Sequence, residues 1–208
     1  MSFGYIGDTS TSVKQQVKNK GILTTQESFD LERQGFLGGS LELIESQTVS
    51  EVTSVTFSNI KEDVYDVHLF TGTINDTATG TVGRGNKIQF FESGVLETAS
   101  VYEYAIQFGS SSGTFSEARG SDSQIRLGGF DNDIISTNFH CYLYDLGNSN
   151  KMSFCTFQTM ENFDPLGNFM SFGGGILKQS SIVDGIKYFL DTTDTFTGTL
   201  KLYGIKDL

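Results

Sequence analysis

The feature that most limits how this chain can fold is a change in its hydrophobic period at Ser40. From that residue onwards, apolar side chains recur at every second position in one segment after another, and runs rich in Gly, Asn and Ser separate the segments. An alternation of this kind is typical of β-strands that bury one face. The expected strands cover 40–46, 52–57, 64–70, 87–91, 99–108, 123–127, 137–146, 151–160, 168–178, 185–191 and 198–205.

The order of these segments predicts an all-β fold. No helical pattern long enough for a crossover falls between consecutive strands, so antiparallel pairing is expected and a parallel sheet is not. The composition, with 24 Gly, 18 Phe, 8 Tyr and a single Pro, fits short aromatic strands joined by glycine turns. We therefore predict an antiparallel β-sandwich of jelly-roll type, with an up-and-down barrel as the alternative.

Polar and glycine-rich stretches between the strands are interpreted as loops. The longest are 71–86, 109–122, 128–136 and 161–168, and recognition is expected there because loops on a rigid scaffold usually carry it. The glycine run in FGGGILK has no following helix and no Lys-Ser/Thr pair, so it does not match a phosphate-binding loop. It predicts a turn or a bulge instead.

Residues 1–39 differ from the rest, and the chain is expected to consist of an N-terminal helical arm over 1–39 and a β-sandwich domain over 40–208. Capping residues and glycines predict two short helices, over VKQQVKNK and SFDLERQ. Helices this short are marginal alone, so the arm is expected to gain order by docking on a neighbouring protein. The side chains expected to make that contact are Phe3, Tyr5, Ile6, Val13 and Val17.

Charge and hydropathy exclude several partners. The net charge of -11, from 14 basic and 25 acidic residues, repels phosphate, so we expect no nucleic acid partner. No stretch approaches the roughly 20 apolar residues that cross a bilayer, and the opening MSFGYIGDTSTS lacks the features of a secretory signal. The protein is therefore expected to fold in a cytoplasm and not to insert into a membrane.

Residues able to carry catalysis are few and scattered. His68 and His140 lie in strand patterns among apolar neighbours, which favours structural positions over a catalytic base. Cys141 follows His140 along a strand, so the two side chains point to opposite faces. The acidic cluster at 131–133 lacks the glycine and the distal glutamate of an EF-hand and predicts a surface turn. We expect no catalytic site, no metal and no cofactor, and added Ca²⁺ should leave the melting temperature unchanged.

Cys141 and Cys155 are the only cysteines, and they lie in two expected strands joined by the turn signal GNSN. A turn centred on Asn148 would place them opposite each other on one face of a hairpin, where a disulfide is conceivable. Free thiols are favoured, because proteins made in a cytoplasm keep their cysteines reduced and Cys packs well as a small apolar residue.

Four stretches together resemble a family of structural proteins of tailed phages that infect marine bacteria. They are MSFGYIGD, VTFSNIKEDVYDVHLF, FHCYLYDLGNSNKMSFCTFQT and DGIKYFLDTTDTFTGTLKLYGIK. The GYIG-type segment of the family corresponds to residues 4–7 and its terminal LYGIK motif to residues 202–206. The resemblance implies a virion component, such as a tail-fibre or other tail-associated protein, that is assembled in the host cytoplasm.

Three functions are compatible with these observations. The first is a tail or tail-fibre component, docked by its arm, whose outward-facing β domain attaches to host surface glycans. The second is a capsid decoration protein, which would differ only in where the arm attaches. The third is a glycan-active enzyme on a jelly-roll scaffold, which needs two carboxylates about 5 to 9 Å apart in a groove. A homo-oligomer is expected, with a trimer favoured, because such proteins are commonly symmetric.

Overall fold

The computed structural model describes residue 26 and residues 40–76, 85–128, 134–163, 167–190 and 195–206. The chain divides into two units, Met1–Leu41 and Glu42–Leu208, and the account below concerns the second. The two expected helices of the arm and its five docking residues, Phe3, Tyr5, Ile6, Val13 and Val17, lie outside the described residues. Within the described residues, no helix is long and apolar enough to cross a membrane.

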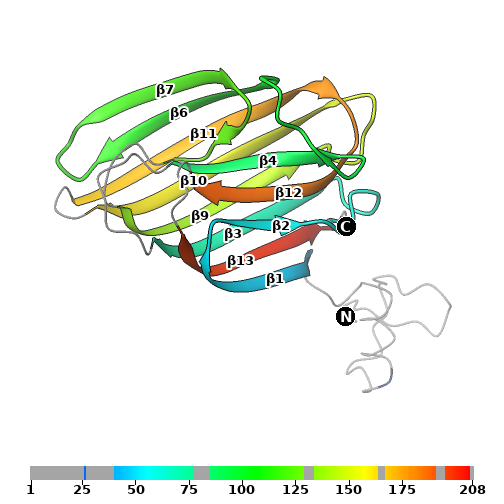
Figure 1. Cartoon of the computed structure of the whole chain (residues 1–208), viewed down its shortest axis with the longest axis horizontal. Coiled ribbons are helices and arrows are strands. Elements are labelled where there is room, and N and C mark those ends of the chain that lie inside the picture. The colour runs from blue at the N-terminus through cyan, green and yellow to red at the C-terminus, as the bar shows by residue number, and fades with distance from the viewer. Residues whose placement is uncertain are drawn as a thin grey trace, which may run out of the picture. The chain divides into compact units, whose positions relative to one another are not determined.

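The β unit contains two sheets (Figure 1). The strands of the larger sheet are, in spatial order, β1 (Leu41–Val52), β13 (Phe196–Ile205), β3 (Val67–Asp76), β9 (Ile134–Tyr144), β10 (Met152–Phe163), β11 (Gly167–Ser180), β6 (Tyr102–Ser110) and β7 (Phe115–Asp122). Those of the smaller sheet are β2 (Ser54–Phe57), β12 (Val183–Leu190), β4 (Asn86–Glu92) and β5 (Val95–Leu96), with β8 (Ile125–Arg126) also paired to β4. Neighbouring strands run antiparallel, as β10 does against both β9 and β11.

The period of two in the sequence becomes a division between two faces. Along β10, Cys155, Phe157 and Thr159 are buried, while Gln158 and Met160 between and beyond them are exposed. Because successive side chains of a strand point to opposite faces, one face of the larger sheet is covered and the other is open to solvent. We call the open one the outer face.

Aromatic contacts join the covered face of the larger sheet to the smaller sheet. The ring of Phe57 on β2 meets that of Phe70 on β3 edge-on at 5.5 Å between centroids. The ring of Tyr188 on β12 stacks on that of Phe139 on β9 at 5.3 Å and 12°. Such pairs add to the burial of their apolar area. The two sheets therefore enclose one core, and the all-β antiparallel arrangement predicted from the sequence is confirmed.

Several expected loops are strands in the structure. The polar stretch at 109–122 was predicted as a loop, yet β7 pairs with β6 from Tyr102 opposite Asp122 to Gly109 opposite Phe115. Strands β3, β9, β10 and β11 likewise extend into the stretches predicted as loops at 71–86, 128–136 and 161–168. Hydrogen bonds to a neighbouring strand hold these segments, so they need no apolar alternation of their own.

The prediction of a turn or bulge at FGGGILK was wrong. Gly173, Gly174 and Gly175 lie within β11, and each is paired to both β10 and β6 without a register shift. A Cβ added to Gly173 would lie 2.2 Å from the backbone oxygen of Ala105, and one on Gly175 would lie 2.5 Å from the Ile125 side chain. These two glycines are needed for close packing inside the sandwich, not for a change of chain direction.

Candidate functional site

The candidate site lies on the outer face, in the middle of the larger sheet. The register places Thr71 of β3 opposite His140 of β9, and His140 opposite Gln158 of β10. His140 and Gln158 are exposed and Thr71 is half-buried. Three polar side chains from three strands therefore form one row across the sheet.

A second row runs beside the first. Thr73 of β3 is opposite Asn138 of β9, which is opposite Met160 of β10, which in turn is opposite Met170 of β11. Asn138 and Met160 are exposed. Residues in adjacent rows are two apart along each strand, so their side chains share one face and stand next to each other.

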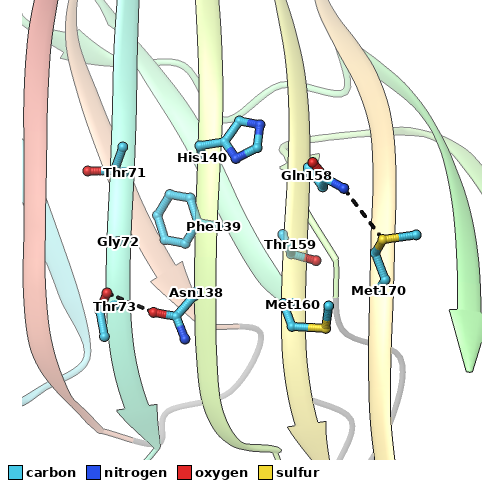
Figure 2. Close-up of a pocket in the computed structure, with 10 residues that line it drawn as sticks. All are labelled: Thr71, Gly72, Thr73, Asn138, Phe139, His140, Gln158, Thr159, Met160 and Met170. Carbon is cyan, nitrogen blue, oxygen red and sulfur yellow. Dashed lines mark hydrogen bonds between the residues drawn. The ribbon is translucent and has the colours of Figure 1, made fainter. Parts of the chain in front are cut away.

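The two rows border a shallow hollow with a volume of about 360 Å³ (Figure 2). It is lined by Thr71, Gly72, Thr73, Asn138, Phe139, His140, Gln158, Thr159, Met160 and Met170. Gly72 and Phe139 are buried beneath the hollow, and the ring of Phe139 fills the space that a Cβ on Gly72 would take, 2.2 Å from that position.

Most of the hydrogen-bonding capacity of the hollow is unused. The Thr73 hydroxyl donates to Oδ1 of Asn138 at 2.8 Å, and Nε2 of Gln158 lies 3.4 Å from Sδ of Met170, a weak acceptor. Within the described part of the chain, the amide nitrogen of Asn138, the carbonyl oxygen of Gln158 and the imidazole of His140 have no other hydrogen-bond partner. These groups are exposed and can bind a ligand that has both donors and acceptors.

Aromatic rings and small residues continue the outer face next to the hollow. Phe154 and Phe172 are 44% and 41% exposed, and Gly174 lies two residues after Phe172 on β11, opposite Ala105 of β6. Phe154, Ala105 and Gly174 border a second depression of about 390 Å³. Exposed rings beside small residues such as Ala105 and Gly174 offer flat apolar contacts to a ligand.

The side chains that line the hollow can bind a ligand, but they include no pair of carboxylates and no thiol beside the imidazole, the pairs that often catalyse hydrolysis. Its side chains on the outer face supply hydroxyls, amides, an imidazole and thioethers, without any carboxylate, thiol or ammonium group, whereas the ring of Phe139 is buried in the core. The ring of Tyr142 lies edge-on to that of His140 with centroids 6.0 Å apart. Among the described residues, no three His, Cys, Asp or Glu side chains are grouped so as to hold a metal ion. The arrangement suits an uncharged polar ligand held by hydrogen bonds and van der Waals contact.

The two histidines have different surroundings. His140 lines the hollow, whereas His68 is completely buried in the covered side of β3, where its Nε2 lies 2.8 Å from the backbone oxygen of Ile60. Burial lowers the pKa of His68 below its usual 6.5, since a charged ring loses its hydration there. Its Nδ1 has no hydrogen-bond partner. His68 is therefore a structural residue, as its position in a strand pattern predicted.

The two cysteines share the covered face without facing each other. Cys141 is opposite Phe157 and Cys155 is opposite Leu143, so the hairpin is centred on Ser149 and not on Asn148 as the sequence reasoning assumed. Both are free thiols and buried. Burial raises the pKa of the Cys141 thiol well above its usual value, which keeps it protonated and unreactive.

A polar network crosses the interior between the sheets. The amide of Asn86 on β4 donates to Oε1 of Glu161 on β10 at 2.7 Å, and the Tyr188 hydroxyl on β12 donates to Oδ1 of Asn86. Glu161 is only 1% exposed. Buried polar groups are tolerated when they bond to one another, so this network ties the two sheets together and is not open to a ligand.

Sequence reasoning did not single out the hollow. Its members are ordinary polar residues spread over four strands, and only the register between strands brings them together. One signal was present, because exposed positions of the expected strands at 137–146 and 151–160 carry Asn, His, Gln and Met in place of the charged residues usual on a solvated face. The acidic cluster at 131–133 lies outside the described residues.

Comparisons with known proteins add little to this geometry. No protein-family model matches the chain, and no curated protein matches it. Among solved structures, the chain is similar to the CBM2 module of an evolved Dit of Lactobacillus casei BL23 phage J-1, at 10% sequence identity and a TM-score of 0.26, over 77% of this chain and 76% of that chain. A TM-score of this size establishes neither a common fold nor a common function.

Proposed function

We propose that this chain is a non-enzymatic attachment protein of a tailed bacteriophage, and that its β domain binds a host surface glycan through the hollow on the outer face. The observation that carries the binding proposal is the set of exposed, unpaired polar groups of Asn138, His140 and Gln158. A glycan presents hydroxyl groups that donate and accept at once, together with apolar C–H faces. The thioethers of Met160 and Met170 and the nearby exposed rings supply the matching apolar contacts.

The fold part of the proposal is a jelly roll. Along the chain, β1 and β3 belong to the larger sheet and β2 and β4 to the smaller. Late strands pair with early ones, as β12 does with β2 and β13 with β3. This alternation between sheets, with the end of the chain returning beside its beginning, supports a jelly-roll winding.

The virion part of the proposal rests on the sequence resemblance. The fold itself explains the terminal LYGIK motif, because Leu202 is buried in the core and a Cβ on Gly204 would lie 2.3 Å from the ring of Tyr65. A motif that completes the fold does not identify a partner. Attachment to the particle through Phe3, Tyr5, Ile6, Val13 and Val17 remains a prediction, tested by deleting residues 1–20. A truncated protein that still joins the particle would contradict it.

The glycan proposal is tested by screening the purified full chain against immobilised bacterial polysaccharides and then measuring the affinity of the best ligand. The single variants His140→Ala and Gln158→Ala should each reduce that affinity by about tenfold or more, because each variant lacks a hydrogen bond to the ligand. Gln107→Ala is the matched control, because Gln107 is exposed on the same face but on β6, outside the hollow. Equal losses of affinity in all three variants would mean that the glycan does not bind in the hollow. The absence of binding to any polysaccharide would refute the glycan proposal.

Location in the particle is tested by electron microscopy of virions labelled with an antibody against this chain. Label at the tail is the expected result for an attachment protein. Label over the head would make the chain a decoration protein, and purified particles without label would remove the virion assignment altogether.

A further inference from the structure

Strand β7 forms one edge of the larger sheet (Figure 1). Among the described strands it pairs with β6 alone, along its whole length. Its other side therefore presents backbone N–H and C=O groups without a strand partner. Such an edge is a template for another chain unless charges of one sign, prolines or a covering segment protect it.

The side chains of β7 do not protect the edge in these ways. Phe115 is 78% exposed, and the strand FSEARGSD contains no Pro and no Lys. Glu117 and Arg119 are exposed, and neither forms an ion pair with another residue of the described chain. Two side chains of opposite charge therefore lie two residues apart on the same face of this edge strand.

We propose that β7 pairs antiparallel with β7 of a second copy of this chain, about a two-fold axis at Ala118. In that register, Glu117 of each copy is opposite Arg119 of the other, so each charge gains one partner and the interface gains two ion pairs. Opposite charges directly across an antiparallel pair stabilise it, whereas like charges destabilise it. The pairing is isologous, as in most closed homodimers.

The other edges are poorer candidates. At the far edge of the larger sheet, β1 carries three glutamates and no basic residue, so two copies of it would bring like charges together. Glu42 of β1 is already paired with Lys61 and Lys206. The outermost strands of the smaller sheet, β2 and β5, have four and two residues and offer few backbone hydrogen bonds.

The pairing has a consequence for binding. A two-fold axis through an antiparallel strand pair is perpendicular to the sheet, so the outer faces of both copies point to the same side. If the proposed function is correct, two hollows then face one surface, and attachment to a dense glycan layer gains from avidity. The dimer itself does not depend on the glycan proposal.

The test is sedimentation analysis of the full chain over a range of concentrations. We expect a monomer–dimer equilibrium for the natural protein. Arg119→Glu and Glu117→Arg each place like charges across the interface and should weaken dimerisation by about tenfold or more. The double exchange Glu117→Arg with Arg119→Glu restores opposite charges and should restore the dimer.

Circular dichroism and the melting temperature serve as the folding control, because both side chains are exposed and unpaired within the described chain. Single reversals that leave dimerisation unchanged, a double exchange that fails to restore it, a trimer, or a monomer up to the solubility limit would each overturn the proposal. Affinity for a soluble monovalent sugar should be the same in all variants. Loss of the dimer with unchanged monovalent binding separates this inference from the glycan site.

Discussion

The two faces of the larger sheet are made by the same strands and have opposite chemistry. On the covered face, Glu161 accepts a hydrogen bond from Asn86 of the smaller sheet, which in turn accepts one from the Tyr188 hydroxyl. On the outer face, Asn138 and Gln158 leave donors and acceptors free for solvent or a ligand. Substitutions on the first face should therefore change stability, and substitutions on the second should change binding.

The adjacent glycines of β11 provide the sharpest comparison of the two faces. Gly173→Ala puts a Cβ 2.2 Å from the Ala105 backbone oxygen and 3.0 Å from the Phe157 ring, and should lower the free energy of unfolding by about 3 kcal/mol. Gly174→Ala meets only the Cys155 backbone oxygen, at 3.0 Å, and should change it by about 1 kcal/mol at most. Urea denaturation measures both variants. Similar losses in the two would show that the faces are not distinct at β11.

A pair of asparagines extends the comparison to hydrogen bonds. Asn86→Ala leaves the buried Glu161 carboxylate and the Tyr188 hydroxyl without that partner, and should destabilise the fold by about 2 kcal/mol. Asn138→Ala removes an exposed amide, so the free energy of unfolding should change by about 0.5 kcal/mol or less, while affinity for the glycan falls. Thermal denaturation and the binding assay are run on both proteins. A destabilised Asn138→Ala variant would mean that the hollow is part of the structural core.

The buried His68 predicts a pH dependence of stability that belongs to the covered face. Burial lowers the pKa of His68 below 6.5, so the unfolded chain takes up a proton more readily than the folded one. The stability contributed by neutral His68 is present above pH 6.5 and is lost as the pH falls below it, by at most about 1.4 kcal/mol per pH unit.

Chemical denaturation between pH 7 and pH 5 measures this loss. His140→Ala should retain the loss seen in the natural protein, whereas His68→Asn should lower the stability at pH 7 and show a smaller change with pH. The same slope in both variants would assign the titration to other groups.

Which parts of this structure could be predicted depends on where the information lies in the chain. Strands such as β10 were predictable because burial of one face makes apolar and polar residues alternate, as the buried Cys155 and Phe157 do with the exposed Gln158. Strand β7 was missed because it is an edge strand held by backbone hydrogen bonds to β6, and Ala118 is its one apolar residue that packs against the core. The packing role of Gly173 was missed because it depends on the approach of Ala105, far away in sequence.

The candidate site was less predictable than the fold for the same reason. Thr71, His140 and Gln158 become neighbours only through the pairing of β3, β9 and β10, and no local pattern specifies which strands pair. The polar, glycine-rich stretches suggested recognition in the loops, whereas the candidate site lies on the sheet itself. A sheet face with exposed amides and thioethers is a signal that alternation analysis can detect, provided the exposed positions are examined as closely as the buried ones.

The smallest expected effect concerns a surface cluster where the two ends of the β unit meet. Glu42 of β1 contacts Lys206, just after β13, at 2.8 Å and Lys61 at 3.4 Å. The pKa of Glu42 is lowered from 4.5 to about 2. The largest cause is the hydrogen bond from Lys206, and a hydrogen bond from Tyr65 adds to it. The stability contributed by this carboxylate is therefore present above pH 4.5 and is lost as the pH falls towards 2.

Because Glu42 and Lys206 are both more than a third exposed, solvent screens the pair. Lys206→Ala should therefore cost less than about 1 kcal/mol, while raising the pKa of Glu42 in a titration followed by NMR. Lys178→Ala, which removes a similar exposed pair with Glu103 on the outer face, is the matched control and should leave the pKa of Glu42 unchanged. A large stability loss with Lys206→Ala would mean that the LYGIK motif stabilises the fold mainly through its lysine. We expect it to do so instead through the burial of Leu202 and the fit of Gly204 against Tyr65.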